Sequence, residues 1–146
     1  MQRLKTRAQF DAVLQGKRVA SSAHFVLHQA PLALVRAAAP VSGAWQAETS
    51  GWGALVPKRW ARRAVTRNAI RRQIYSLIPL CAQTYPQAGY VVRMRCEFDR
   101  HQFPSASSVA LKQAVRTELR ALFEAALRRL SDCAASATQA TETLTP

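Results

Sequence analysis

A dense run of basic side chains occupies the middle of the sequence. Between Lys58 and Arg72, seven of fifteen residues are Lys or Arg, and no carboxylate occurs between Glu48 and Glu97. Unpaired like charges repel one another, so such a cluster is favourable where a polyanion supplies the missing negative charge. The alternative is a solvated helix face. We interpret the run as a surface that binds phosphate groups.

The overall composition supports this interpretation. The 146 residues include 21 Lys plus Arg against 8 Asp plus Glu, which gives a formal net charge of +13, a balance typical of nucleic-acid-binding proteins. With 49% hydrophobic residues the chain can bury a core of single-domain size. We therefore expect one nucleic-acid-binding domain over residues 1–130. Residues 131–146, rich in Ser, Ala and Thr, are predicted to be a disordered tail.

Cysteine usage and the absence of long apolar runs indicate a cytoplasmic protein. The three cysteines, Cys81, Cys96 and Cys133, show no C-x-x-C spacing, so neither a zinc site nor a disulfide framework is indicated. Gln9 and Asp11 interrupt the stretch where a signal peptide would be apolar. No apolar run approaches the ~18 residues that a membrane span needs.

Hydrophobic periodicity predicts an α+β fold in the order helix, strands, helix, strand, helix, with the helices packed on a small, mostly antiparallel sheet. Residues 31–50 are predicted to be a surface loop. Arg93 and Arg95, on one face of the last strand, belong either to an exposed sheet edge or to the nucleic-acid surface. The predicted elements are a helix over 6–16, strands over 19–29 and 52–56, a helix over 62–81, a strand over 90–96, and a helix from Ser105 or Ser107 to about residue 130.

The basic run begins the helix over residues 62–81, and the two halves of this helix differ in character. At 100° per residue, the apolar stripe of the second half projects back onto Arg63 and Arg67 in the first half. We therefore predict that the first half overhangs the core and forms one wall of a groove. The stripe consists of Ile70, Ile74, Leu77, Ile78 and Cys81.

The segment from Gly53 to Arg72 resembles the signature of the bacterial ribonuclease P protein subunit. In that signature a strand leads through a basic link to Arg-Asn-Arg, an apolar residue and two more basic residues. Here Arg67 and Asn68 match the start of the triplet, Ile70 the apolar position, and Arg71 with Arg72 the closing pair. The opening Arg3-Leu4-Lys5 is also similar, and the resemblance covers residues 3–128.

This resemblance implies a fold like the second domain of small-subunit ribosomal protein five, with a left-handed crossover between parallel strands. It also implies a function. The family's catalyst is an RNA subunit that hydrolyses precursor tRNA at the 5′ side with bound Mg²⁺, and the protein binds this RNA and the single-stranded 5′ leader. The chain alone is then expected to be non-catalytic, to hold no metal, and to need no membrane and no obligate protein partner.

The resemblance also assigns residues to two binding sites. The leader cleft corresponds to Phe10, Leu14, His28 and Arg67. Leu14 and His28 stand where aromatic residues are usual. Ala69 replaces the second arginine of the triplet, and we expect it beside Arg72 on the helix face away from the apolar stripe. The residues expected to bind the RNA subunit are Lys58, Arg59, Arg62, Arg63, Arg67, Asn68, Arg71 and Arg72.

Three other classes of protein share parts of this pattern. A ribosomal or RNA-chaperone protein would share the composition and the fold class. A DNA-binding helix module would need a helix and tight turn before the basic helix, whereas a strand ending at Pro57 precedes it. A protein-only nuclease would need a metal or acid-base site. His24 and His28, expected on one face of a strand, would lie about 13 Å apart, and Glu97 with Asp99 suggests a solvated pair.

Overall fold

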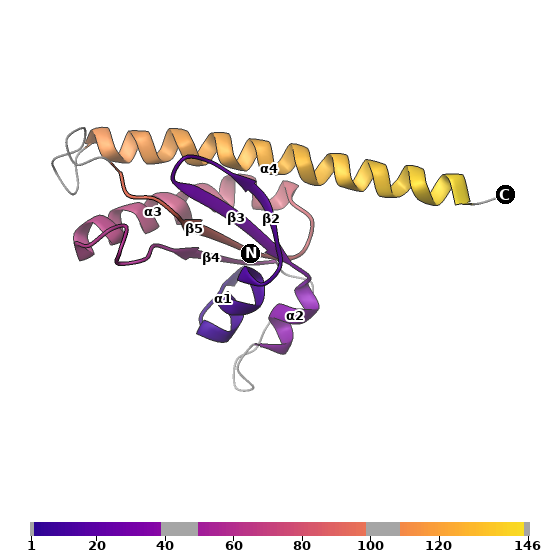
Figure 1. Cartoon of the computed structure of the whole chain (residues 1–146), viewed down its shortest axis with the longest axis horizontal. Coiled ribbons are helices and arrows are strands. Elements are labelled where there is room, and N and C mark those ends of the chain that lie inside the picture. Colours follow the sequence, from indigo (N-terminus) through magenta and orange to yellow (C-terminus); the bar gives the residue numbers. More distant parts are fainter. Residues whose placement is uncertain (1, 39–49, 99–108, 145–146) are drawn as a thin grey trace.

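The computed structural model describes residues 2–38, 50–98 and 109–144, with side chains as far as residue 132 in the last segment. These segments form one five-stranded sheet with helices on both of its faces (Figure 1). The elements in chain order are β1 (Gln2–Arg3), α1 (Arg7–Leu14), β2 (Lys17–Ser21), β3 (Phe25–Ala30), α2 (Leu32–Ala37), β4 (Gly51–Leu55), α3 (Ala64–Cys81), the 3-10 turn η1 (Ala82–Thr84), β5 (Gly89–Met94) and α4 (Val109–Leu144).

The sheet is mixed, with strand order β1-β4-β5-β3-β2. β3 pairs antiparallel with β2 and β5, whereas β4 pairs parallel with β1 and β5. Most paired residues of the sheet are antiparallel, as predicted, and β5 runs parallel to β4 because α3 returns the chain between them. Residue alternation within a strand does not encode this direction. The left-handed sense of the crossover and the ribosomal kinship stay predictions.

Each face of the sheet has its own core. On one face α3 and α4 cover a large core that contains an aromatic cluster, in which Trp52 and Tyr90 stack with ring centroids 4.3 Å apart. On the other face α1 and α2 cover a smaller core built around Val13, Val35 and Val91. Since α1 has 8 residues and α2 has 6, against 18 in α3 and 36 in α4, the second face has far less helical cover.

The first helix begins and ends where the sequence predicts. The Thr6 side chain accepts a hydrogen bond from the Gln9 backbone N–H, and the Gln9 side chain accepts one from the Thr6 backbone N–H, which is a capping box. The helix stops just before Gly16. A Cβ at Gly16 would lie 2.1 Å from the Gln29 carbonyl oxygen, so the close approach of the chain there requires glycine.

Two predictions about the N-terminal half need correction. The strand expected over residues 19–29 is a hairpin, in which β2 and β3 are joined by a turn at residues 22–24. The predicted loop over 31–50 contains the short helix α2, which exists because Val35 is fully buried in the smaller core. Residues 39–49 of that loop lie outside the described residues.

The C-terminal half agrees with the sequence up to residue 130 and differs beyond it. β4, α3 and β5 match the predicted elements within two residues at each described end. The predicted caps Ser105 and Ser107 lie outside the described residues. α4 continues as helical backbone to Leu144, well past the sheet (Figure 1), where a disordered tail was predicted. Ala, Gln and Glu in this stretch are good helix formers, and a helix already nucleated by packing extends at little cost.

Candidate nucleic-acid interface

The link between β4 and α3 folds back under the first turn of the basic helix. Ala61 in this link is buried in the larger core, and Trp60 packs against the same core. One nitrogen of Arg67, Nη1, donates to the carbonyl oxygens of Ala61 at 3.1 Å and Arg62 at 2.8 Å. Arg63 is the N-cap residue with extended backbone, outside the helix. The link therefore fills the core-facing side of the first turn of α3. This corrects the prediction that Arg63 and Arg67 form one wall of an open groove on that side.

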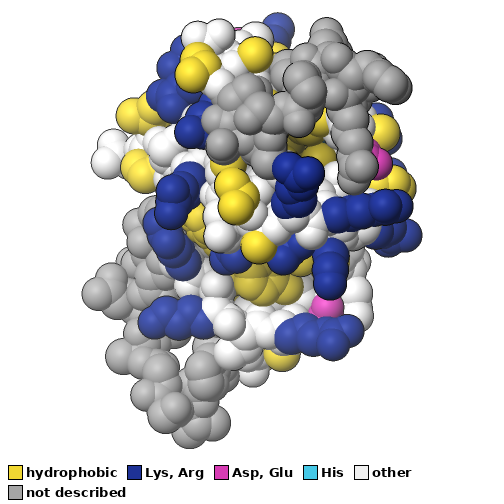
Figure 2. All heavy atoms as spheres, turned by 90° about the vertical axis from the view of Figure 1, so that its left-hand side faces the viewer, with side chains coloured by type: hydrophobic (Ala, Val, Ile, Leu, Met, Phe, Trp, Pro, Cys, Tyr) yellow, Lys and Arg dark blue, Asp and Glu magenta, His cyan; other side chains and the backbone are white. Residues whose placement is uncertain are grey.

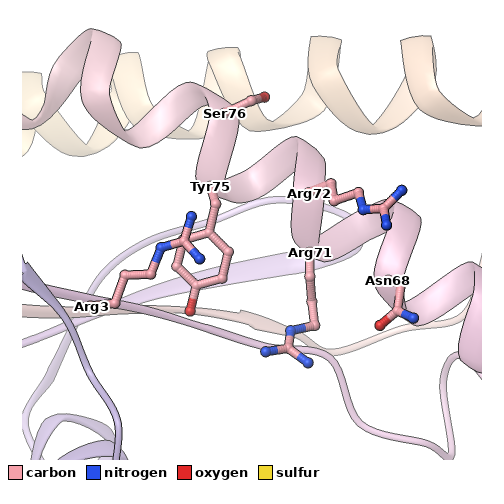
Figure 3. Close-up of a pocket in the computed structure, with 6 residues that line it drawn as sticks. All are labelled: Arg3, Asn68, Arg71, Arg72, Tyr75 and Ser76. Carbon is pink, nitrogen blue, oxygen red and sulfur yellow. The ribbon is translucent and has the colours of Figure 1, made fainter.

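The groove lies instead on the outer side of α3, and we call it the Arg71 groove. It has a volume of about 550 Å³, and none of the described residues that line it is acidic. Figure 3 shows Arg3 lying over the ring of Tyr75, with Arg71 and Arg72 extending from the preceding turn of α3. Guanidinium groups bind phosphate oxygens through paired N–H donors and also stack on bases, so this lining suits RNA. The lining residues are Arg3, Asn68, Arg71, Arg72, Tyr75 and Ser76.

A second groove, the Lys112 groove, follows the seam between α3 and α4 and has a volume of about 250 Å³. Asn68 and Arg72 line both grooves, so they form the ridge between them. Arg116 of α4 lies beside this seam, with Nη1 at 3.4 Å from the Gln73 side-chain oxygen. The basic surface thus continues onto α4. The residues that line this groove are Val65, Asn68, Ala69, Arg72, Gln73 and Lys112.

Ala69 lies beside Arg72, as expected, but it does not face solvent. Only 8% of its surface is exposed, and Lys112 of α4 lines the same groove. The prediction that Ala69 points away from the buried part of the helix was therefore wrong. The buried face of α3 is wider than the stripe that faces the sheet, because α4 also packs along one side of α3 and covers Ala69.

The remaining predicted cations sit in the link and line neither groove. Lys58, Arg59, Arg62 and Arg63 are all exposed, and the Arg59 guanidinium lies 5.1 Å from the centroid of the Trp60 ring. Figure 2 shows Lys and Arg side chains spread over this face of the molecule, with few acidic side chains among them. The structure therefore brings together Asn68, Arg71 and Arg72, and places the link cations nearby at the start of α3.

The residues assigned to the leader cleft mostly share the less covered face of the sheet. Phe10 and Leu14 of α1 are half-buried against the smaller core, and His28 of β3 belongs to the same face. Phe10 rests on Gly53, where an added Cβ would lie 2.6 Å from Phe10 Cε1. Arg67 belongs to α3 on the opposite face, and its described bonds are to the link. Three of the four predicted cleft residues therefore come together.

His28 is a buried polar residue without a described partner. It is 5% exposed, and neither ring nitrogen has a hydrogen-bond partner among the described residues. Burial lowers its pKa to about 4, helped by the positive charges of Arg93 and Arg18, so its imidazole is neutral at pH 7. The Arg93 Nε is likewise buried and unpaired within the described part of the chain. These unpaired polar atoms lie below the surface of the α1 face, so a ligand reaches them only if neighbouring side chains move.

Arg93 and Arg18 are functional candidates that the sequence left open or missed. β5 lies between β4 and β3 in the sheet, so the edge alternative is wrong for Arg93. Arg18 pairs across the β2–β3 hairpin with His28, but its place there depends on a hairpin that the sequence did not predict. Arg95 is exposed just past β5, and its Nε donates to the Ser22 carbonyl oxygen.

The residues considered for a nuclease site lie apart. His24 precedes β3, bonds through Nδ1 to Glu118 of α4 at 2.6 Å, and stacks on Phe98 at 3.8 Å. His28 lies on the other face of the sheet, so the expectation of one shared face was wrong. Asp99 is outside the described residues. Within the described segments, no three His, Cys, Asp or Glu residues gather in a way that could hold a metal ion.

Two further observations concern the cysteines and the helices. Cys81 and Cys96 are free, and burial raises the pKa of the Cys81 thiol to about 11. None of the helices described here is both long enough and apolar enough to cross a membrane.

A mixed sheet with helices on both faces, a groove of arginines with no carboxylate among its described lining residues, and a second polar surface define a small α+β nucleic-acid-binding protein. The family model described as Ribonuclease P matches residues 1–126. The chain belongs to the ribonuclease P protein family. It is accordingly a protein component of ribonuclease P, the ribonucleoprotein that processes tRNA.

Relatives and solved structures agree with the family match. The chain is 34% identical over 122 residues to the ribonuclease P protein component of Bordetella petrii, covering 83% of this chain and 88% of that one. It is 34% identical over 129 residues to that of Ralstonia pickettii, covering 88% and 81%. The ribonuclease P proteins of Staphylococcus aureus (TM-score 0.59, 17% identity, coverage 85% and 94%) and Thermotoga maritima (0.55, 20%, 84% and 96%) share the fold.

Proposed function

We propose that this chain binds the RNA subunit of ribonuclease P along α3 and holds the 5′ leader of precursor tRNA on the sheet face beside α1. The RNA subunit then performs the hydrolysis, and the protein supplies binding and orientation. The observation that carries this proposal is the Arg71 groove, which Arg3, Arg71 and Arg72 line together with no acidic residue among the described lining residues.

The two grooves along α3 suit a folded RNA. Asn68 and Arg72 stand on the ridge between the grooves, Arg71 and Arg3 lie on one side, and Lys112 lies on the other. Such a ridge can contact phosphates of two adjacent backbone segments. Each neutralised phosphate releases condensed counterions, so the affinity should fall steeply with salt. The exposed link cations, Lys58 to Arg63, add long-range attraction at the same end of α3.

The α1 face suits a single-stranded leader. Phe10 presents a half-buried ring, and stacking a base on such a ring is worth about 1 to 3 kcal/mol. His28 is neutral at pH 7, so one ring nitrogen can donate and the other can accept a hydrogen bond, and both become available to a base edge if the side chains that cover them move on binding. Arg18 and Arg93 flank it and supply positive charge for the leader phosphates. With Leu14 and His28 in place of aromatics, this chain depends less on stacking and more on polar contacts.

The Mg²⁺ ions of this proposal belong to the RNA subunit, where they activate water and stabilise the leaving oxygen. The residues of this chain act before that step. Those of the Arg71 and Lys112 grooves orient the RNA subunit, and those of the α1 face hold the leader. A protein bound to both RNAs brings substrate and catalyst together, which matters most when Mg²⁺ is scarce and phosphate repulsion is strong.

A reconstitution experiment tests the proposal. Purified chain, the ribonuclease P RNA of the same genome and a precursor tRNA are mixed at low Mg²⁺, and the 5′ product is measured with each component omitted in turn. We expect rapid cleavage only with protein and RNA subunit together. Mg²⁺-dependent cleavage by the RNA-free protein would contradict the non-catalytic role, and an unchanged rate on adding the protein would contradict the binding role.

Matched variants assign the effect to the groove. Arg71→Ala with Arg72→Ala should lower affinity for the RNA subunit and reduce its salt dependence by about two units, because two fewer phosphates are neutralised. Arg36→Ala is the control, because Arg36 is an exposed arginine of α2 that lines neither groove. Equal losses in both proteins would mean that net charge, and not the groove, determines binding.

A further inference from the structure

Arg3 and Tyr75 form a positioned pair in the Arg71 groove. The Arg3 guanidinium carbon lies 4.1 Å from the centroid of the Tyr75 ring, a cation–π contact. Both side chains line the groove together with Arg71 and Arg72 (Figure 3). Arg3 comes from β1, far from α3 in the sequence. Its presence in the groove is therefore a product of the fold.

Tyr75 is itself fixed by the sheet. Its hydroxyl oxygen accepts a hydrogen bond from the Ala54 backbone N–H at 3.2 Å. β1 is short and pairs with β4 only at Gly51 and Trp52, so it ends before reaching Ala54. The tyrosine thus satisfies a strand N–H that β1 leaves free, and the same contact holds its ring beneath Arg3. A side chain of α3 is in this way connected to both β4 and β1.

We propose that Arg3 is an RNA-binding residue, that Arg3 and Arg71 together bind one phosphodiester of the partner RNA, and that Tyr75 is the positioning residue that holds Arg3 in place. This inference rests on the proposed function, since it specifies how the Arg71 groove recognises RNA. The chemistry is that of a phosphate between two guanidinium groups, with Arg72 and Asn68 lining the rest of the groove.

The contact between Arg3 and the Tyr75 ring lowers the entropic cost of binding RNA. An exposed arginine side chain loses much rotamer freedom when it binds, and that entropy opposes binding. Arg3 is exposed, and its cation–π contact restricts the guanidinium before RNA arrives. The ring also offsets part of the repulsion between Arg3 and Arg71, because the face of an aromatic ring is electron-rich. Among the residues that the structure describes, no acidic side chain lines the groove and competes with the phosphate for these cations.

Four variants test the proposal, with affinity for the ribonuclease P RNA measured over a salt series. Arg3→Ala should weaken binding on the order of tenfold and reduce the salt slope by about one unit. Arg3→Lys keeps the charge but lacks the planar fork, so it should restore the slope and only part of the affinity. Tyr75→Leu should weaken binding in the same direction as Arg3→Ala. Tyr75→Phe keeps the ring but loses the hydroxyl that bonds Ala54, so its affinity should lie between those of Tyr75→Leu and the wild type.

The shared phosphodiester gives a further signature. Because Arg3 and Arg71 contact the same group, the double variant Arg3→Ala with Arg71→Ala should lose less than the sum of the two single losses. Thermal unfolding midpoints of all variants separate folding from binding. If Tyr75→Leu fails to fold, Arg3→Ala and the double variant still decide the matter, since the Arg3 side chain is exposed.

The outcomes distinguish this inference from the proposed function. If Arg71→Ala weakens binding while Arg3→Ala leaves affinity and slope unchanged, the Arg3 subsite is wrong and the RNA-binding role of α3 stands. If Arg3→Ala weakens binding but folded Tyr75→Leu binds as the wild type does, Tyr75 does not position Arg3. If the wild-type chain itself does not bind the RNA subunit, the proposed function fails, and this inference fails with it.

Discussion

Phe10 of α1 rests its ring on Gly53 of β4, so closely that a Cβ at position 53 would lie 2.6 Å from Cε1 and 2.8 Å from Cζ of that ring. Because residue 53 is glycine, α1 lies close enough to the sheet for the Phe10 ring to be half-buried. The ring packs against the sheet and is still partly exposed. This is the arrangement expected of a residue that both packs and stacks.

Gly53→Ala should displace the Phe10 ring and destabilise the protein. The contact distance is well below any ordinary Cβ contact, and the neighbouring atoms belong to a ring held against the sheet. We expect a loss of about 1 to 3 kcal/mol, typical of overpacking, measured by urea unfolding. Combining it with Phe10→Leu, which removes the ring, should restore part of the stability. No restoration would mean that the strain arises elsewhere.

Phe10→Ala should reduce affinity for precursor tRNA more than for mature tRNA, in the presence of the RNA subunit. Only the precursor carries a leader that can stack on the ring, and one stacked base is worth about 1 to 3 kcal/mol. Phe10→Leu is the matched control for packing without a flat ring. Equal losses on both substrates, after correction for stability, would show that Phe10 serves the core alone.

Arg67→Ala and Arg71→Ala should show which of the two arginines stabilises the fold and which binds RNA. Arg67 bonds the carbonyl oxygens of Ala61 and Arg62 and is half-buried, so its loss should cost about 1 to 2 kcal/mol of unfolding free energy. Arg71 is exposed, and its loss should cost less than about 0.5 kcal/mol. Both variants should weaken RNA binding and lower the salt slope, because a guanidinium retains further N–H donors after bonding the link. If Arg67→Ala affects stability alone, Arg67 is a brace only.

Ala69→Arg tests whether the Lys112 groove faces RNA. The side chain would enter this groove beside Arg72 and Lys112, and because Ala69 is only 8% exposed we expect a cost of about 1 kcal/mol. If the groove meets RNA, the added cation should tighten binding at low salt and steepen the salt slope by about one unit. Ala69→Gln controls for size without charge. An unchanged slope would place this groove in solvent.

His28 should make the protein less stable in mild acid. Its folded pKa of about 4 is below the ordinary value of 6.5, so the unfolded chain binds the proton more readily. The contribution of the neutral imidazole is fully present above pH 6.5 and is lost as the pH falls toward 4, by about 1 to 3 kcal/mol. Urea unfolding from pH 4 to pH 7 should show this slope in the wild type and a smaller slope in His28→Leu. Parallel curves would mean that His28 is not buried in its neutral form.

The sequence alone determined the family, the α+β class and the boundaries of α1, β4, α3 and β5 to within two residues, because these depend on short-range patterns. The Thr6 capping box, the apolar stripe of Ile70 and Ile74, and the unpaired charge of the 58–72 run are all readable within one or two turns of chain. Such signals survive in any tertiary context because they report local hydrogen bonding, burial period and charge density.

Only the tertiary structure decided which of these residues meet. Arg3 reaches the groove through the β1–β4 pairing, Ala69 is covered by α4, and Arg18 meets His28 through an unpredicted hairpin. The parallel pairing of β4 with β5 likewise depends on how α3 crosses the sheet. Each of these contacts joins two segments that are distant in the sequence, and the pattern of one segment does not specify the other. The alternation of residues in a strand determines which side chains share a face, but it does not determine which strands pair or in which direction they run.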